Sequence, residues 1–134
     1  MLEVHLVEGD HAPDRLTALL ERLSAAYAEV LGSPPDRIRA FATLHRRELW
    51  ATGGRVGGPP APYFTAVVLE GRPVDQRHRL LGALTDVVVA ELGVERRLVR
   101  GRVVPVHPDD WGIGGVPASA VRRGEITARA VTAP

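Results

Sequence analysis

Hydrophobic positions along the chain follow two spacings, one typical of strands and one typical of helices. Residues 2–7 and 64–69 are short runs rich in β-branched or aromatic residues, and each run ends in Glu-Gly. After each run, hydrophobic residues recur every three or four positions up to Gly32 or Gly93, which predicts two helices that end at those glycines. The predicted helix stripes are Leu16, Leu19, Leu20, Leu23, Tyr27 and Val30 in the first helix and Leu80, Leu81, Leu84, Val87, Val88 and Leu92 in the second.

A further strand is predicted after each helix, over residues 38–44 and 98–106. Each half of the chain therefore has the order β-α-β, and such a crossover makes its two strands parallel. Two units predict an α+β sandwich in which a four-stranded sheet carries both helices on one face. The other face of the sheet stays bare, so we expect the chain to associate with copies of itself.

The two halves also repeat each other in sequence. Leu-Val-Glu-Gly at residues 6–9 recurs as Val-Leu-Glu-Gly at residues 68–71, and a tryptophan followed by a glycine pair occurs at both Trp50 and Trp111. The pattern Arg-Ile-Arg at residues 37–39 likewise recurs as Leu-Val-Arg. We expect one domain over residues 1–134, made of a first pseudo-repeat (1–56), a connector (57–62), a second pseudo-repeat (63–124) and a tail (125–134).

Composition narrows the possible chemistry. A net charge of +1 gives no reason to expect nucleic acid or a membrane surface as a partner, and no apolar run is long enough to span a bilayer. The absence of cysteine excludes disulfides and thiolate metal sites, and the absence of lysine excludes a P-loop or a lysine Schiff base. The α-amine of Met1 is the sole amine and a candidate base, with an ordinary pKa of roughly 7.7 to 8.0. Without a signal peptide at the N-terminus, we expect a cytoplasmic location.

Arginines are the main candidates for binding an anion, because a guanidinium holds a carboxylate through two parallel hydrogen bonds. Arg72 follows the third predicted strand, where the first repeat has Asp10, and this difference suggests that one copy is specialised for binding. A solvated arginine at a helix start is the alternative. Arg39 and Arg100 share a repeat position within predicted strands, and Arg102 points to the same face as Arg100. Salt bridges within an oligomer are the alternative for these three.

The aromatic residues and histidines add weaker candidates. Trp50 and Trp111 share a repeat position and either cap an apolar pocket or pack in the core, and Tyr27 on the helix stripe is favoured as a core residue. The five histidines show no metal-ligand spacing, so neither a metal nor a cofactor is expected. The Gly-Ile-Gly-Gly segment at residues 112–115 predicts a hairpin or an oligomer contact, and residues 122–134 predict a short strand or hairpin followed by a loose tail.

The whole pattern resembles the tautomerase superfamily, whose unit is a β-α-β of this size. The most specific segments are residues 68–72, Val-Leu-Glu-Gly-Arg, and residues 110–119 around Trp111, which look like the corresponding stretches of 4-oxalocrotonate tautomerase. The length is similar to that of the fused members, both those like 4-oxalocrotonate tautomerase and those like cis-3-chloroacrylic acid dehalogenase. The resemblance implies an isomerase and a homotrimer.

The resemblance also implies an N-terminal proline as the proton-transfer group, and here the sequence departs from the family. Met1 aligns with the family's second residue, while the proline of the second copy falls at Pro62, inside the chain. We therefore expect the catalytic proline to be absent. An upstream proline as the true N-terminus is a further explanation that the residues leave open.

Carried over residue by residue, the resemblance maps the family's carboxylate-binding arginine onto Arg72, its strand arginine onto Arg39 or Arg100, and its pocket aromatic onto Trp50 or Trp111. In the dehalogenase-like members a helix histidine falls near Tyr27 and a strand tyrosine near Arg102, so dehalogenation is disfavoured here. The catalytic candidates are Met1, Arg72, Arg39 and Arg100, and the substrate-binding candidates are Arg102, Trp50, Trp111 and Tyr27.

Two functions are weighed. The first is keto-enol tautomerisation of a small 2-oxo or enol carboxylate, with arginines on the carboxylate and the amine of Met1 as the base. A related possibility is that this amine forms an imine with a carbonyl substrate. The second function is that of a non-catalytic or diverged homologue that keeps the trimer and binds a small acid.

Overall fold

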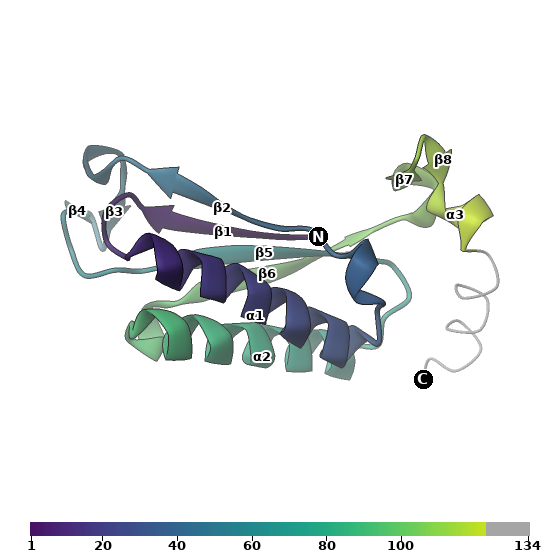
Figure 1. The fold of residues 1–134 in the computed structure, drawn as a ribbon, viewed down its shortest axis with the longest axis horizontal. Coiled ribbons are helices and arrows are strands. Elements are labelled where there is room, and N and C mark those ends of the chain that lie inside the picture. The colour runs from purple at the N-terminus through teal and green to yellow at the C-terminus, as the bar shows by residue number, and fades with distance from the viewer. Residues whose placement is uncertain (123–134) are drawn as a thin grey trace.

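A computed structural model of the protein describes residues 1–122 as two layers, a sheet and a pair of helices (Figure 1). The sheet has the order β2-β1-β5-β6. Its strands are β1 (Leu2–Val7), β2 (Ala40–His45), β5 (Tyr63–Leu69) and β6 (Arg100–Val106), and its helices are α1 (Pro13–Leu31) and α2 (Val74–Leu92).

Both helices cover the same face of the sheet, which confirms the predicted sandwich. β1 pairs in parallel with β2, and β5 pairs in parallel with β6, as the β-α-β crossovers require. The two central strands β1 and β5 are antiparallel, so the start of β1 lies beside the end of β5.

Alternating side chains of the central strands form the core with the helix stripes. Leu2, Val4 and Leu6 of β1 are buried against the helices, and so are three residues of β5. The ring of Phe64 occupies the space that a side chain at Gly101 would need, so β6 passes this aromatic ring without a Cβ. The helices end at Gly32 and Gly93, both with positive φ, as predicted.

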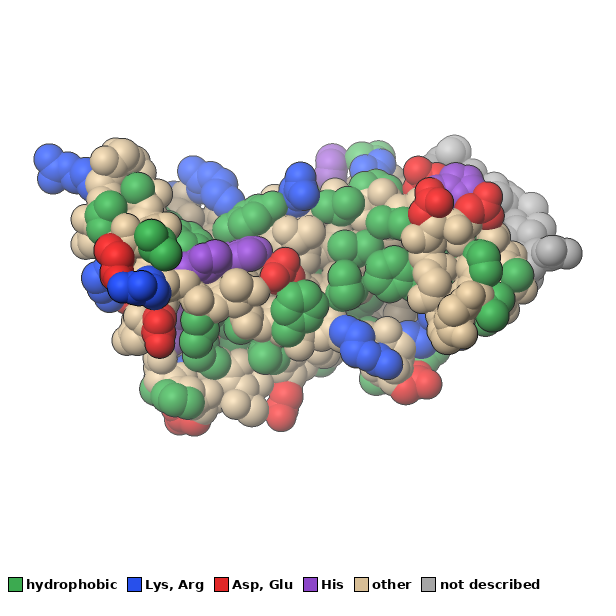
Figure 2. Space-filling view, turned by 90° about the horizontal axis from the view of Figure 1, so that it is seen from above, with side chains coloured by type: hydrophobic (Ala, Val, Ile, Leu, Met, Phe, Trp, Pro, Cys, Tyr) green, Lys and Arg blue, Asp and Glu red, His purple; other side chains and the backbone are tan. Residues whose placement is uncertain are grey.

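The opposite face of the sheet carries no helix. Figure 2 looks onto this face and shows hydrophobic side chains over its middle with charged groups around them. Phe41 of β2, on this open face, is 41% exposed. The open apolar face is the feature from which the sequence predicted self-association.

Two strands begin later than predicted. Pro35–Arg37 and Arg96–Leu98 form 3-10 turns after the helices, and β2 and β6 start only at Ala40 and Arg100. The prediction that Arg39 lies within a strand is therefore wrong, because Arg39 precedes β2. In the first of these turns, Pro35 fixes the φ angle that a tight turn needs.

Each half ends in a two-stranded hairpin built on a glycine pair. The hairpins are β3–β4 (Ala51–Thr52 with Arg55–Val56) and β7–β8 (Gly112–Ile113 with Val116–Pro117), and they lie at opposite ends of the molecule (Figure 1). The second is the hairpin predicted from residues 112–115. A short helix α3 (Ala118–Val121) follows, and the tail predicted for residues 125–134 lies outside the described residues. Within residues 1–122, neither long helix is apolar enough to traverse a bilayer.

Candidate functional site

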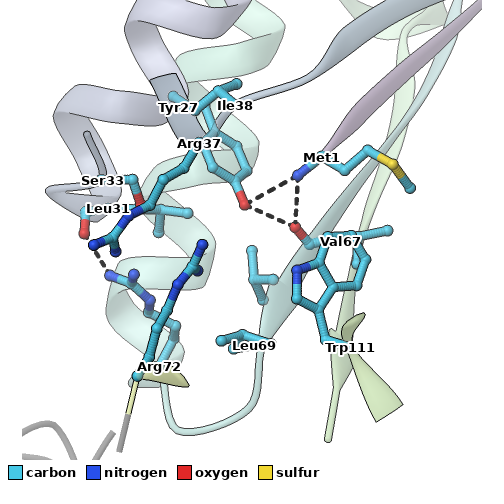
Figure 3. A pocket seen from close by; sticks show the side chains of 12 residues that line it. Met1, Tyr27, Leu31, Ser33, Arg37, Ile38, Val67, Leu69, Arg72 and Trp111 are labelled. Carbon is cyan, nitrogen blue, oxygen red and sulfur yellow. Dashed lines mark hydrogen bonds between the residues drawn. The ribbon is translucent and has the colours of Figure 1, made fainter. Parts of the chain in front are cut away.

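A small cavity lies where the first residue of the chain meets the end of β5. Its volume is about 60 Å³, and we call it the inner chamber (Figure 3). The residues that line it come from the first position of the chain, from α1 and the segment up to β2, from β5 and the turn after it, and from the positions just before β7 and just after α3. They are Met1, Tyr27, Leu31, Ser33, Arg37, Ile38, Val67, Val68, Leu69, Arg72, Trp111 and Arg122.

The α-amine of Met1 is fixed inside this chamber by two hydrogen bonds. The amine donates to the hydroxyl of Tyr27 at 3.3 Å and to the carbonyl of Val67 at 3.2 Å. Burial disfavours the charged ammonium form and lowers the pKa of the amine from its ordinary 8.0 to about 6. The amine is therefore largely neutral, and so basic and nucleophilic, at pH 7.

Tyr27 serves both the core and the chamber. Its ring belongs to the buried stripe of α1, as the sequence favours, and the residue is only 7% exposed. Its hydroxyl, however, donates to the Val67 carbonyl at 2.7 Å and accepts from the Met1 amine. The helix thus places a phenol next to the only amine of the chain.

Arg72 stands in the turn between β5 and α2, and it is held rather than solvated. Its Nη1 donates to the carbonyl of Leu31 at 2.5 Å, at the end of α1. Gly71, with φ of 107°, provides the backbone conformation for this turn. Figure 3 shows Arg72 and Arg37 on one side of the chamber and Met1 and Trp111 on the other. A ligand between them meets guanidinium groups at one end and an amine at the other.

A second, wider cavity of about 630 Å³ adjoins the chamber, and we call it the outer hollow. The two share Arg37, Trp111 and Arg122 as wall residues, and the outer hollow adds Arg39. The Arg39 guanidinium donates to the carbonyl of Asp36 at 3.0 Å. Arg39 is therefore next to the chamber but does not line it.

Sequence reasoning missed Arg37 and Arg122 as lining residues. Arg37 of the first repeat corresponds to Leu98 of the second, so the two copies differ at this position as well, here with the arginine in the first copy. That difference was visible in the sequence. Arg122 follows α3, and nothing in the repeat pattern singles it out.

The other candidates lie away from the chamber in the single chain. Arg100 and Arg102 pair in register with Tyr63 and Thr65, at the opposite end of β5 from Leu69. The Arg100 guanidinium donates to the carbonyls of Arg97 and Val99, much as Arg39 bonds its own backbone. The structure therefore brings Met1, Tyr27, Arg72 and Trp111 together, and it does not bring Arg100 and Arg102 to them.

Trp50 lies in the corresponding region of the first repeat, at the other end of the sheet. It lines a small cavity with Asp10 and Arg47, and those two side chains form an ion pair. Asp10 occupies the repeat position of Arg72, so this end presents a carboxylate already neutralised by the protein. The two ends of the sheet therefore differ in charge, and only the Met1 end offers arginines with an amine.

The open face of the sheet carries a polar cluster near Trp50. His5 Nδ1 and His45 Nε2 are 2.7 Å apart, the two rings stack, and Glu3 lies 3.3 Å from the other nitrogen of His5. Trp50 packs edge-on against His45. In the described part of the chain, no three His, Asp or Glu side chains are grouped as metal ligands.

Comparison with known proteins gives curated relatives that match somewhat less than half of the chain and solved structures that match about nine-tenths of it. A probable tautomerase of Ralstonia nicotianae is 38% identical over 61 residues, which is 46% of this chain and 87% of that protein. A probable tautomerase of Listeria innocua is 33% identical over 60 residues, 45% of this chain and 98% of that protein. No protein-family model matches the chain.

Solved structures match almost the entire fold. A native fused 4-OT is 31% identical and has a TM-score of 0.85, with 91% of this chain and 98% of that chain covered. A second fused 4-OT, described as an asymmetric trimer, is 28% identical with a TM-score of 0.84 and coverage of 90% and 97%. The two-layer architecture is thus shared over about nine-tenths of the chain with proteins described as fused 4-OT.

Proposed function

The chain belongs to the tautomerase superfamily, and from this premise we propose that it catalyses proton transfer on a small 2-oxo or enol carboxylate in the inner chamber. The observation that carries this proposal is the partly buried Met1 amine, which lies 3.3 Å from the Tyr27 hydroxyl and opposite Arg37 and Arg72. A neutral amine with a pKa of about 6 is suited to accept a proton at neutral pH.

In the proposed reaction, Arg72 and Arg37 bind the carboxylate and the amine takes the proton. Arg72 is held in place by the Leu31 carbonyl, and a guanidinium suits a carboxylate because it can bind both oxygens through two parallel hydrogen bonds. The base then returns its proton to the carbon of the dienol or enol, giving the ketone. Trp111 forms the apolar wall along which the carbon chain of the substrate lies.

In this proposal the Met1 amine takes the role of the proline that the family resemblance implies. A primary amine, like a secondary one, carries a lone pair that can accept a proton. The sheet supports the assignment, because the backbone of Met1 is bonded to Val67 and the amine cannot leave the chamber without breaking that pair.

We further propose that the working form is a homotrimer joined through the open face of the sheet. The exposed Phe41 and the hydrophobic groups over that face support an interface there. Fused 4-OT structures that match this chain are described as trimers. In the proposed trimer, Arg100 and Arg102 of one protomer could reach the inner chamber of a neighbouring protomer and bind substrate there.

The test is ultraviolet-monitored ketonisation of 2-hydroxymuconate and phenylenolpyruvate, with untagged protein and with the same protein acetylated at its amine. The chain contains no lysine, so acetylation of amines modifies Met1 alone. We expect turnover by the unmodified protein and its loss on acetylation. Turnover that survives acetylation contradicts Met1 as the base. Ligand binding without any turnover instead supports the role of a non-catalytic acid-binding homologue.

A further inference from the structure

The amine at the centre of the inner chamber is a primary amine, and this permits chemistry beyond proton transfer. A primary amine condenses with a ketone or aldehyde to give a neutral imine. The reaction begins with attack of the nitrogen lone pair on the carbonyl carbon, so the amine must be unprotonated. Arginine side chains do not react in this way, and the described chain offers no lysine. Any imine formed by this protein with a carbonyl compound is therefore assigned to Met1.

The hydrogen bonds of the amine leave its lone pair available. A neutral primary amine has two N–H groups, and two acceptors lie beside it, the Tyr27 oxygen at 3.3 Å and the Val67 carbonyl at 3.2 Å. With both hydrogens so placed, neither acceptor engages the lone pair. Burial lowers the pKa of the amine to about 6, so the neutral form predominates at pH 7.

The rest of the chamber favours one class of carbonyl compound. Arg72 and Arg37 line the side opposite Met1, and the volume is only about 60 Å³. A carboxylate on the arginines therefore places the atom bonded to it close to the amine. In a 2-oxo acid that next atom is the carbonyl carbon itself.

We propose that the Met1 amine also acts as a nucleophile and forms an imine with small 2-oxo acids bound at Arg72 and Arg37. This inference rests on the proposed substrate pocket but not on the amine acting as a base. The nitrogen bonds to C2, and the carbonyl oxygen becomes a hydroxyl and leaves as water after taking up a second proton. The resulting iminium withdraws electrons from C3, so loss of a C3 proton gives an enamine.

The Tyr27 hydroxyl is the group placed to move protons in these steps. It lies 3.3 Å from the nitrogen and is oriented by its bond to the Val67 carbonyl at 2.7 Å. Protonation of the enamine at C3 and attack of water on C2 reverse the sequence and release the 2-oxo acid and the free amine. The net result is exchange of the C3 protons, with no oxidation or reduction.

The experiment is reductive trapping. Untagged protein is incubated with pyruvate and cyanoborohydride at pH 7, and its intact mass and N-terminal peptide are measured. The intact mass before treatment establishes that Met1 is the first residue. We expect one reduced pyruvate unit per chain, on the Met1 peptide, formed at least about tenfold faster than the adduct with acetone, which has no carboxylate to pair with arginine.

Two controls separate the pocket from an ordinary amine. Protein unfolded in urea retains only the intrinsic difference in carbonyl reactivity between pyruvate and acetone, so its preference for pyruvate is expected to be smaller than that of the folded protein. Protein extended at its N-terminus by Gly-Ser, which moves the amine out of the chamber, is expected to show the same reduced preference as the unfolded protein. A ratio of pyruvate to acetone labelling that is no larger in the folded protein than in these two controls overturns the proposal.

The outcome is distinguishable from that of the proposed tautomerase reaction. If the protein catalyses ketonisation but forms no pyruvate adduct, the amine acts only as a base and the imine proposal is overturned. If a pyruvate adduct forms but no ketonisation is seen, the imine proposal stands and the proposed tautomerisation is overturned. Where both occur, borohydride with pyruvate is expected to abolish turnover, whereas borohydride alone is expected to leave it unchanged.

Discussion

Met1 and Val67 are bonded to each other twice. The Val67 N–H donates to the Met1 carbonyl at 2.8 Å, and the Met1 amine donates to the Val67 carbonyl at 3.2 Å. This reciprocal pair continues the antiparallel ladder of β1 and β5, in which Leu2 pairs with Ala66. The reactive nitrogen is thus positioned by the two central strands, on a rigid part of the fold.

The first prediction concerns pH. Because only the neutral amine accepts a proton, ketonisation is expected to rise with pH, reach half its maximum near pH 6 and stay level from about pH 7 upward. At pH 5, one unit below the pKa, the rate is expected to be about one tenth of the plateau. Initial rates at constant ionic strength between pH 5 and 9 measure this profile. A half-maximum near pH 8 contradicts the effect of burial.

Replacing Tyr27 by phenylalanine tests the phenol beside the amine. The Tyr27 oxygen accepts a hydrogen bond from the amine and so favours its charged form; without it, the pKa of the amine is expected to fall further. The half-maximum of the pH profile should therefore move below pH 6. Tyr63→Phe is the matched control, because its hydroxyl bonds Thr65 on the open face, and its profile is expected to match the original. A shift to higher pH in Tyr27→Phe contradicts the proposed contact.

The sequence predicts the layers of this fold because both halves show the same hydrophobic spacing in their strands and helices and the same glycine at the end of the helix. The helices end at Gly32 and Gly93 as expected, and the alternation in β1 places its core residues correctly. The predicted starts of β2 and β6 are two residues too early, because Ile38 and Val99 have the side chains of strand residues but follow directly on 3-10 turns. Hydrophobicity alone does not distinguish a turn's last residue from a strand's first.

The site was predictable only in part. The difference between Arg72 and Asp10 marks the end of the sheet at which a carboxylate is expected to bind. In contrast, Trp50 and Trp111 occupy equivalent positions, and only the three-dimensional arrangement places Trp111 beside Met1. The contact between Met1 and Tyr27 joins segments whose relative position depends on how the helix lies on the sheet, which no local pattern gives.

Arg72→Gln is expected to weaken substrate binding and the fold together. Loss of the charged hydrogen bonds to a carboxylate costs about 1.5 to 3 kcal/mol, which raises KM by roughly tenfold to a hundredfold. Loss of the bond to the Leu31 carbonyl costs about 1 kcal/mol of unfolding free energy. Gln76→Ala is the matched control, because Gln76 bonds the neighbouring Val30 carbonyl at 3.0 Å but does not line the chamber. It should lose similar stability and keep its KM; an equal rise in KM contradicts a binding role for Arg72.

Gly101→Ala is expected to destabilise the sheet without touching the chamber. The new Cβ overlaps the ring of buried Phe64, and relief of such overpacking costs typically about 1 to 3 kcal/mol. Gly82→Ala in α2 is the control, since nothing surrounds its new Cβ, and it should stabilise the helix by up to about 1 kcal/mol. Urea unfolding of both variants measures the difference. Equal stability of the two variants contradicts the close packing of β6 on Phe64.

The last prediction separates the two tryptophans by fluorescence. Trp111 lines the chamber and the outer hollow, whereas Trp50 lies at the other end of the sheet, with its indole bonded to Thr52 at 3.1 Å. Trp50→Phe leaves Trp111 as the only tryptophan, so titration with pyruvate or 2-hydroxymuconate is expected to change the tryptophan emission. Trp111→Phe leaves Trp50, whose emission should stay constant because no arginine-and-amine chamber adjoins it. A response from Trp50 alone places ligand binding at the Asp10 end of the sheet and contradicts the inner chamber as the site.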